Sequence, residues 1–412
     1  MFCRISLFLC GATLVAAQSH PLSLDDAIRT AWANDPTVAA LALTPELARA
    51  REVQAGLRPN PELDVRGSAP VKGDSEWSVG VGVTQQLPRR ERVELARAYA
   101  RLGAESAALE LRERRRLLAG EVRRLWYEQA MHQARLESAR RTVRLQQEVA
   151  RALQGRRDAG EVADAEWALL QLELARAEQA VTIAEAEIAG SEQRLRKRLR
   201  LPADAALAVS VDLEALLARS LPAPGDLAGS RPELVLADLE VRRAEAALAL
   251  ARGQSRPDWS VGAGVDFERR SNDATGRLEN EPRLSVNASV PWPGGRVANR
   301  GDILEREAAL RIAEANRQSR REELSAEIEA AAASVRAIQP AVQRYHALLQ
   351  NAADLPRKLG PAYARGEVTG FQLAQARQQQ VSIEAEFLSL ATRYLSLLAE
   401  AETTAGLIPS QP

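Results

Sequence analysis

The chain has 412 residues, of which 27% are charged and 46% are hydrophobic, so it is long enough for more than one ordinary domain. Only 4% of the residues are aromatic, which is a small fraction for a protein with a globular core. The 55 basic residues balance the 55 acidic ones, so the net charge does not indicate binding to nucleic acid or to an acidic membrane surface.

The first residues predict a secretory signal peptide over residues 1–17. Arg4 precedes an apolar run that ends at a small-residue cleavage site after Ala17. Cys3 and Cys10 both lie in this segment, so the mature chain has no cysteine for a disulfide. Lipid attachment at Cys10 in place of cleavage is the alternative, although the Leu-Phe-Leu before it matches that processing poorly.

Four later segments alternate apolar and polar residues, in two pairs at about residues 62–86 and 258–292. Period two gives each strand one apolar and one polar face. No run of about 18 apolar residues follows the signal peptide, so only these strands could enter a membrane. A sheet in lipid must close into a barrel, and four strands are too few because membrane barrels begin at about eight, so copies of the chain must combine. The alternating apolar positions are Leu63, Val65, Gly67 and Ala69; Trp77, Val79, Val81 and Val83; Trp259, Val261, Ala263, Val265 and Phe267; Leu284, Val286, Ala288, Val290 and Trp292.

Long helical stretches follow each strand pair. Residues 90–154 contain no proline, which predicts a single helix of ~95 Å. A similar stretch starts at Val297, although Pro340 is expected to kink it and Pro356 and Pro361 to loosen its end. Each long helix should reverse at a glycine turn and form an antiparallel hairpin with the next helix.

Heptad spacing of apolar residues predicts coiled-coil packing in these hairpins. One row runs over residues 163–195, with Ser191 as its one polar member, and recurs over residues 369–401. A second row runs over residues 324–349 and recurs over residues 118–143.

These recurrences indicate an internal duplication, since Asn34-Asp35-Pro36 also matches Ser230-Arg231-Pro232. The second strand pair is longer than the first, and we place the extra residues in an exposed loop over the polar run Arg269–Glu281. The expected organisation is a signal peptide (1–17), a first repeat (18–200), a linker or equatorial segment (201–231), a second repeat (232–405) and a C-terminal tail (406–412).

Three local motifs occur along the chain, and their order is more informative than any one of them alone. They are Leu-Ser-Leu-Asp-Asp-Ala at 22–27, Gly-Leu-Arg-Pro-Asn-Pro-Glu-Leu at 56–63 and Tyr-Ala-Arg-Gly at 363–366. With the signal peptide, strand pairs and duplicated hairpins, the mature chain resembles the TolC-like outer membrane efflux factors. The motif at 56–63, together with Pro-Ala-Val-Gln-Arg-Tyr at 340–345, is most similar to the cobalt-zinc-cadmium, heavy-metal efflux branch.

The resemblance implies a mainly α fold with a membrane β part. Three copies would form a twelve-stranded β-barrel in the outer membrane of a Gram-negative bacterium and a long coiled-coil α-helical barrel in the periplasm. The chain would be a passive exit duct without cofactor or enzymatic activity, and it would bind outer membrane lipid but no nucleic acid. Its partners would be a periplasmic adaptor and a proton-driven inner-membrane pump of the resistance-nodulation-division type. Metal cations are the favoured substrate; the alternatives are a duct for drug efflux or type I protein secretion, and a soluble periplasmic coiled-coil adaptor.

The resemblance places the pore aperture at the helical turns. Glu161 and Glu367 are repeat equivalents, and their carboxylates would form a ring around a trimeric mouth that favours cations. Solvated loop acids are the alternative interpretation. Gln372 and Gln375 occupy positions where family members often carry inner-gate aspartates. The candidates for salt bridges that hold the turns shut are Arg156, Arg157 and Arg365.

Tryptophans mark the predicted strand ends. An aromatic girdle at the membrane interfaces requires such positions, and packing in a soluble sheet is the alternative. No metal site is visible, because His20, His132 and His346 are unclustered, and no catalytic motif is present. The girdle candidates are Trp77, Trp259 and Trp292.

Overall fold

The computed structural model describes residues 22–69, 76–160, 162–202, 207, 209, 213–219, 221, 231–271, 277–292, 299–365 and 367–407. The predicted signal peptide, including Cys10, lies outside these residues, as do most of the linker and the end of the C-terminal tail.

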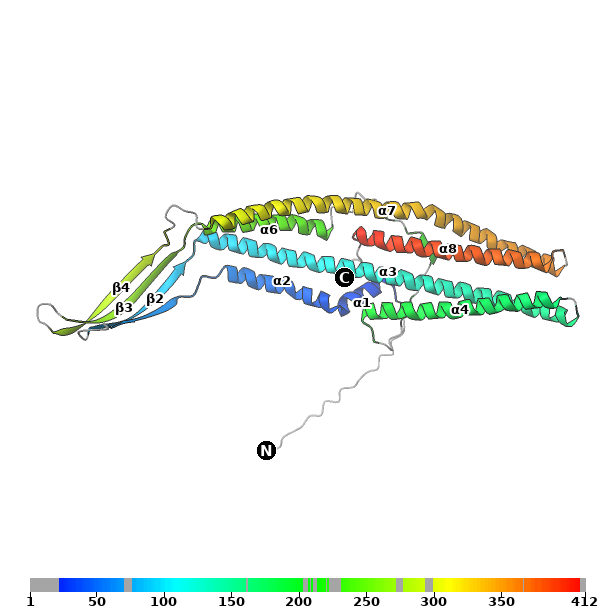
Figure 1. The fold of residues 1–412 in the computed structure, drawn as a ribbon, viewed down its shortest axis with the longest axis horizontal. Helices are drawn as coiled ribbons and strands as arrows, with labels where there is room; N and C mark the ends of the chain where they lie inside the picture. Colours follow the sequence, from blue (N-terminus) through cyan, green and yellow to red (C-terminus); the bar gives the residue numbers. More distant parts are fainter. Residues whose placement is uncertain are drawn as a thin grey trace, which may run out of the picture. The chain divides into compact units, whose positions relative to one another are not determined.

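Two similar series of elements make up the chain (Figure 1). The order helix, strand, strand, long helix, helix occurs twice, as an internal duplication predicts. The helices are α1 (Leu24–Asn34), α2 (Pro36–Ala55), α3 (Arg90–Asp158), α4 (Asp164–Leu199), α5 (Leu213–Leu217), α6 (Pro232–Gln254), α7 (Arg300–Ala364) and α8 (Gly370–Thr404); the strands are β1 (Glu62–Ser68), β2 (Trp77–Leu87), β3 (Trp259–Ser271) and β4 (Leu278–Ser289).

The chain divides into two compact units, and each contains segments of both sequence halves. We call residues 36–116 and 223–329 the strand unit, and residues 1–35, 117–222 and 330–412 the turn unit. The boundaries of these units therefore differ from the boundaries of the sequence repeats.

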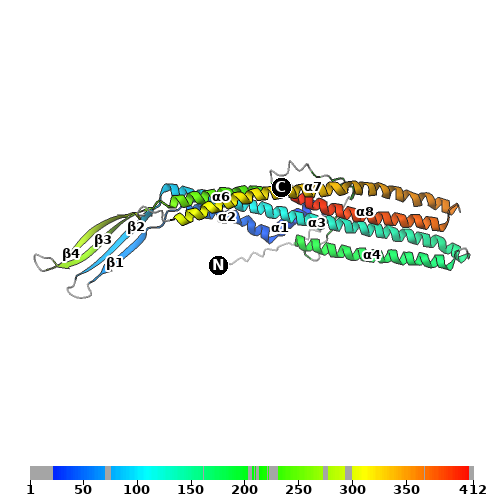
Figure 2. The same ribbon diagram turned by 45° about the horizontal axis from the view of Figure 1, so that its top comes forward.

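One antiparallel sheet in the order β1-β2-β3-β4 forms the β part of the strand unit, and Figure 2 shows all four strands. The central pairing of β2 with β3 joins the two halves of the chain. Val65 on β1 lies opposite Val81, which lies opposite Val265 on β3. Leu284 on β4 completes this row, so the apolar positions of all four strands share one face.

This apolar face is open to the surroundings. The exposed fraction is 49% for Val81 and 78% for Leu284. On the opposite, polar face, the Asp266 side chain of β3 lies over Gly80 of β2. The Thr84 hydroxyl of β2 donates a 2.7 Å hydrogen bond to the Asp64 carboxylate of β1. The apolar face is thus exposed, and on the polar face Gly80 and Gly82 are buried beneath neighbouring side chains.

The second hairpin corrects one prediction from the sequence. Arg269–Ser271 and Leu278–Glu281 belong to strands, with Arg269 opposite Asn280, and are not an exposed loop. The antiparallel ladder continues into this polar run because backbone pairing with the partner strand does not require apolar side chains.

Four helices accompany the sheet in the strand unit, linked in the order α2, α3, α6, α7. Arg101 of α3 donates to Glu52 of α2 at 3.0 Å. Arg242 of α6 pairs with Glu105 of α3 at 3.4 Å, and Arg252 of α6 pairs with Glu307 of α7 at 2.8 Å. The helices α2 and α7 are therefore the outer members of this layer.

In the turn unit the order is α4, α3, α8, α7, which Figures 1 and 2 both show. Arg140 of α3 pairs with Glu185 of α4, and Arg141 of α3 pairs with Glu384 of α8. The rings of His346 on α7 and Phe387 on α8 lie 5.6 Å apart. The outer members here are α4 and α7.

The predicted heptad rows supply much of the core. Buried members include Ala177, Ala184 and Leu195 on α4; Leu118, Val122 and Leu125 on α3; Leu324, Ile328, Val335 and Val342 on α7; and Leu373, Ala376, Phe387, Tyr394 and Ala401 on α8. The polar member Ser191 is buried as well, and its hydroxyl donates a hydrogen bond to the Gln129 side chain.

Prolines do not end α7. Pro340, Pro356 and Pro361 lie inside this helix, which continues to Ala364, so the expected loosening of its end is not seen. Pro340 and Pro361 are exposed, so water can satisfy the carbonyl groups that lack an N–H partner. None of the helices in the described part of the chain combines the length and hydrophobicity that a membrane crossing requires.

Candidate functional site

The turn between α3 and α4 is held by its own side chains. The Gly160 N–H donates to the Arg157 carbonyl at 2.8 Å, and Gly160 has φ +78°, a left-handed conformation that glycine adopts without strain. The Arg157 guanidinium lies 4.9 Å from the Trp167 ring centroid and 3.8 Å from the Asp164 carboxylate. This arginine therefore stabilises the start of α4. Glu161 and the Arg156 side chain lie outside the described residues.

The turn between α7 and α8 contains a bidentate ion pair. Arg365 donates from Nε to Glu367 at 2.6 Å and from its terminal nitrogen at 3.0 Å. This hydrogen bonding holds the pKa of Glu367 below its ordinary value, so the carboxylate is charged at neutral pH. Both side chains are exposed.

A capping box begins α8 next to this pair. The Gln372 N–H donates to the Thr369 hydroxyl at 3.3 Å, and the Thr369 N–H donates to the Gln372 side-chain oxygen at 3.0 Å. Gln372 thus has a structural role at the position where a gate acid was sought, and Gln375 is exposed one turn further on. Among the predicted site residues, the structure brings together Arg365 and Glu367.

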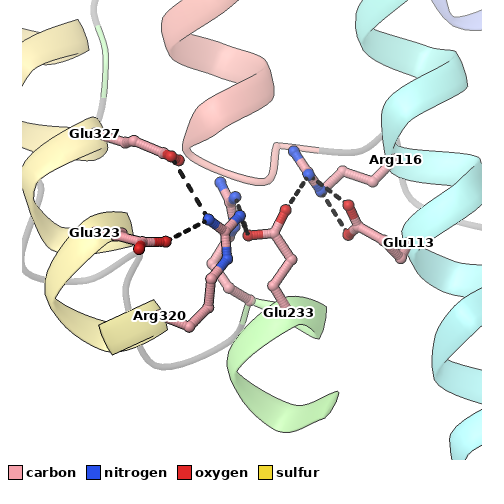
Figure 3. A network of polar contacts seen from close by, with 7 residues as sticks. Glu113, Arg116, Glu233, Arg320, Glu323 and Glu327 are labelled. Carbon is pink, nitrogen blue, oxygen red and sulfur yellow. Dashed lines mark hydrogen bonds and ion pairs between the residues drawn. The ribbon is translucent and has the colours of Figure 1, made fainter. Parts of the chain in front are cut away.

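Sequence reasoning missed a charge network in the strand unit, shown in Figure 3. Glu233, in the first turn of α6, is 2.7 Å from Arg116 of α3 and 2.7 Å from Arg320 of α7. Arg231 precedes α6 and donates to Glu233 at 3.1 Å. Arg231 and Arg116 are only 2% and 4% exposed, so Glu233 lies among two buried cations and a third cation at the edge of the network.

The charges in this network stabilise one another. Burial disfavours ionised Glu233, but Arg231 and Arg116 outweigh this effect and hold the pKa of Glu233 below its ordinary value. Burial also disfavours charged Arg116, yet its hydrogen bond to Glu113 contributes to a net rise in the pKa of Arg116. For Arg231, burial and the neighbouring Arg116 lower the pKa. One indication of this network was present in the sequence, the match of Ser230-Arg231-Pro232 to the first repeat. That match marked the start of a helix but did not indicate which residues form ion pairs with Arg231.

The three girdle candidates lie at the ends of strands. Trp77 is the first residue of β2 and Trp259 the first residue of β3, whereas Trp292 follows the end of β4 and is 87% exposed. Within the described ranges, no three His, Cys, Asp or Glu side chains form a group that could hold a metal ion. His132 instead lies beside Glu187 of α4, with its Nδ1 at 3.1 Å from the carboxylate.

Comparison with known proteins agrees with this architecture. Residues 27–199 match the family model described as outer membrane efflux protein. This match covers less than half of the chain, and it shows that residues 27–199 are similar to the outer membrane efflux proteins. A search of curated proteins finds no match.

Solved structures described as membrane channels or outer membrane proteins have the same fold. CusC is 18% identical, with a TM-score of 0.69 over 93% of this chain and 91% of that one. The open state of MtrE from Neisseria gonorrhoeae is 16% identical, with a TM-score of 0.69 over 93% of this chain and 88% of that one. VceC from Vibrio cholerae is 16% identical, with a TM-score of 0.67 over 93% of this chain and 96% of that one. At these identities the likeness establishes the fold and does not distinguish a metal-efflux branch.

Proposed function

We propose that this chain is an outer membrane efflux protein and one third of a trimeric channel in the outer membrane of a Gram-negative bacterium, where it acts as the passive exit duct of a tripartite efflux system. The observation that carries the proposal is the four-stranded sheet with an exposed apolar face and unpaired edges at β1 and β4. Hydrocarbon suits that face, but it cannot satisfy the backbone groups of the two edges. Pairing β4 of one copy with β1 of the next satisfies them and closes twelve strands.

The helical layers support the same head-to-tail arrangement. In the strand unit, exposed apolar side chains lie on the outer helix from each half, α2 and α7. In the turn unit they lie on α4 and again on α7. Every layer thus has one uncovered edge from the first half and one from the second, which is the pattern of a heterologous ring interface. On these outer helices the exposed residues are Leu43, Leu47 and Val53 on α2; Leu169, Leu172 and Ile183 on α4; and Leu304, Ile312, Leu348 and Leu355 on α7, whereas the inner helices α3 and α6 carry fewer, namely Leu117, Leu145 and Val235.

The polar face of the sheet would line the duct. Its acidic side chains outnumber its basic ones, which favours cations over anions in a narrow aqueous passage. This excess, and the sequence resemblance to the heavy-metal branch, support metal cations as the substrate. The acidic residues on this face are Glu62, Asp64, Asp266, Glu268, Glu279 and Glu281, and the basic ones are Arg66, Arg270 and Arg283.

The aperture is proposed at the helical turns, where Glu161 and Glu367 supply carboxylates and the Arg365 pair limits how freely Glu367 moves. The duct itself performs no chemistry, so energy comes from an inner-membrane pump that a periplasmic adaptor connects to these turns. A drug-efflux or type I secretion duct remains the alternative in the same class. The soluble adaptor alternative expected one hairpin, whereas the chain has two hairpins and an exposed oily sheet.

Two measurements test the proposal. Purified protein in detergent should have the mass of a trimer and should conduct ions after insertion into planar bilayers. Deletion of the gene should sensitise the host to cobalt, zinc or cadmium salts, and a panel of drugs is the control. A stable monomer, or protein released from membranes by salt alone, contradicts the channel. Sensitivity to drugs alone contradicts only the metal substrate.

A further inference from the structure

Arg269 has an unusual position on the sheet. It is the one charged side chain on the apolar face of the described strands, where every neighbouring row is apolar or uncharged. It lies opposite Trp77 on β2 and opposite Asn280 on β4. The next row toward the helices consists of Val79, Phe267 and Pro282.

The height of this row matches a membrane boundary. Trp259 begins β3, and Arg269 lies ten residues further along the strand. At about 3.3 Å per residue these positions are roughly 33 Å apart along the strand, or about 25 Å along the membrane normal at the usual strand tilt. A band of that height is what membrane barrels expose to lipid, with aromatic residues at both limits. Arg269 therefore lies at the limit of the band that is distant from the helices, beside Trp77.

The guanidinium of Arg269 is available for a ligand. It is exposed, and it makes no ion pair or hydrogen bond with any residue in the described part of the chain. Two other arginines near the sheet have carboxylate partners: Arg283 pairs with Glu268 at 3.1 Å, and Arg92 pairs with Asp258. A charge on the lipid side is costly at mid-membrane but nearly free at the interface, where headgroups begin.

We propose that Arg269, with Trp77 and Asn280 beside it, binds the phosphate of a phosphorylated lipid headgroup in the outer leaflet. Guanidinium binds phosphate through two parallel N–H donors, and an indole ring favours the headgroup level. The Asn280 amide offers a further donor in the same row. This inference rests on the proposed function, since the periplasmic location of the helices puts Arg269 at the outer leaflet.

The test uses the purified trimer and native mass spectrometry. Retention of lipid A is compared with retention of enzymatically dephosphorylated lipid A, for wild type and for Arg269→Ala. One cation at a membrane surface changes lipid affinity about fivefold. Arg269→Ala should therefore retain about fivefold less lipid A than wild type, and the same amount of dephosphorylated lipid A as wild type. Arg269→Lys should retain an amount of lipid A between that of wild type and that of Arg269→Ala, because its charge remains but the two parallel donors are lost.

Arg270→Ala is the matched control, since this neighbour is equally a surface arginine but projects to the polar face. Its lipid A retention should equal that of wild type. Equal retention by Arg269→Ala and wild type, or an equal loss in Arg270→Ala, overturns the site. A wild-type trimer that conducts ions but does not prefer phosphorylated lipid overturns the site alone, whereas protein that never enters a bilayer overturns the proposed function as well.

Discussion

Removing the carboxylate of Glu233 should destabilise the strand unit strongly. The Glu233→Gln variant keeps the side-chain volume but leaves Arg231 and Arg116 buried without their shared counter-ion. Breaking a buried ion pair by removing one partner costs about 3–5 kcal/mol. We take the lower end, about 3 kcal/mol, because Arg116 keeps Glu113 at 2.6 Å.

The assay is thermal unfolding of the detergent-solubilised protein, followed by circular dichroism. For a cooperative unit of the size of the strand unit, 1 kcal/mol shifts Tm by about 2–4 °C, so a loss of about 3 kcal/mol in Glu233→Gln should lower Tm by about 6–12 °C. The control is Glu323→Gln, which removes an exposed partner of Arg320 at 3.2 Å and should change stability by less than about 1 kcal/mol. Equal Tm values for the two variants would refute the reasoning.

The same network sets a direction for pH dependence. The pKa of Glu233 lies below its ordinary 4.5 in the folded protein, so its contribution is complete above that pH. The stabilisation is lost as the pH falls through the lowered folded pKa. The Tm difference between wild type and Glu233→Gln should therefore shrink in acid and be constant from about pH 6 to 8.

Three further predictions concern the pore, the lipid face and the helix packing. The double variant Glu161→Gln with Glu367→Gln should lower cation preference in single-channel recordings, whereas Gln375→Asn should not; an unchanged reversal potential contradicts the aperture assignment. Val81→Arg should prevent folding into lipid vesicles, since arginine at mid-membrane costs about 2–4 kcal/mol per chain, whereas Val81→Leu should fold normally. Gly120→Ala should destabilise the turn unit by about 1–3 kcal/mol, because a Cβ there meets the Thr403 side chain. Gly103→Ala has open space around the new Cβ and should stabilise the protein by about 0.5–1 kcal/mol. Urea unfolding that ranks the two variants in the reverse order contradicts this packing.

Local patterns were sufficient to predict the strands and the heptad rows. A period of two or three and a half depends on neighbouring residues alone, so Val81 and Val265 were assigned to the oily face correctly. The end of β3 and the start of β4 were wrongly predicted as a loop, because polar residues such as Arg270 and Glu279 are typical of loops. The backbone ladder nevertheless continues wherever both strands remain in register.

The charge network could not be predicted in this way. Arg116, Glu233 and Arg320 lie far apart in the sequence and in segments crowded with other charges. Only the packing of α3, α6 and α7 determines which of these charges loses its water. Similarly, Gln372 looked like a substituted gate acid until the structure showed its side chain capping α8.

The contacts between the two halves of one chain differ in chemistry from the proposed contacts between copies. Within a chain the halves meet through the β2 and β3 ladder and through buried charges, since Arg116 comes from the first half and Glu233 from the second. Buried ion pairs add little net stability but are costly to mispair, so they favour one partner and one register. Between copies, the uncovered edges carry leucines and isoleucines that any matching edge can cover. In the helical layers, the contact between the halves of one chain is thus more selective than the proposed contact between copies, where only the pairing of β4 with β1 would fix the register.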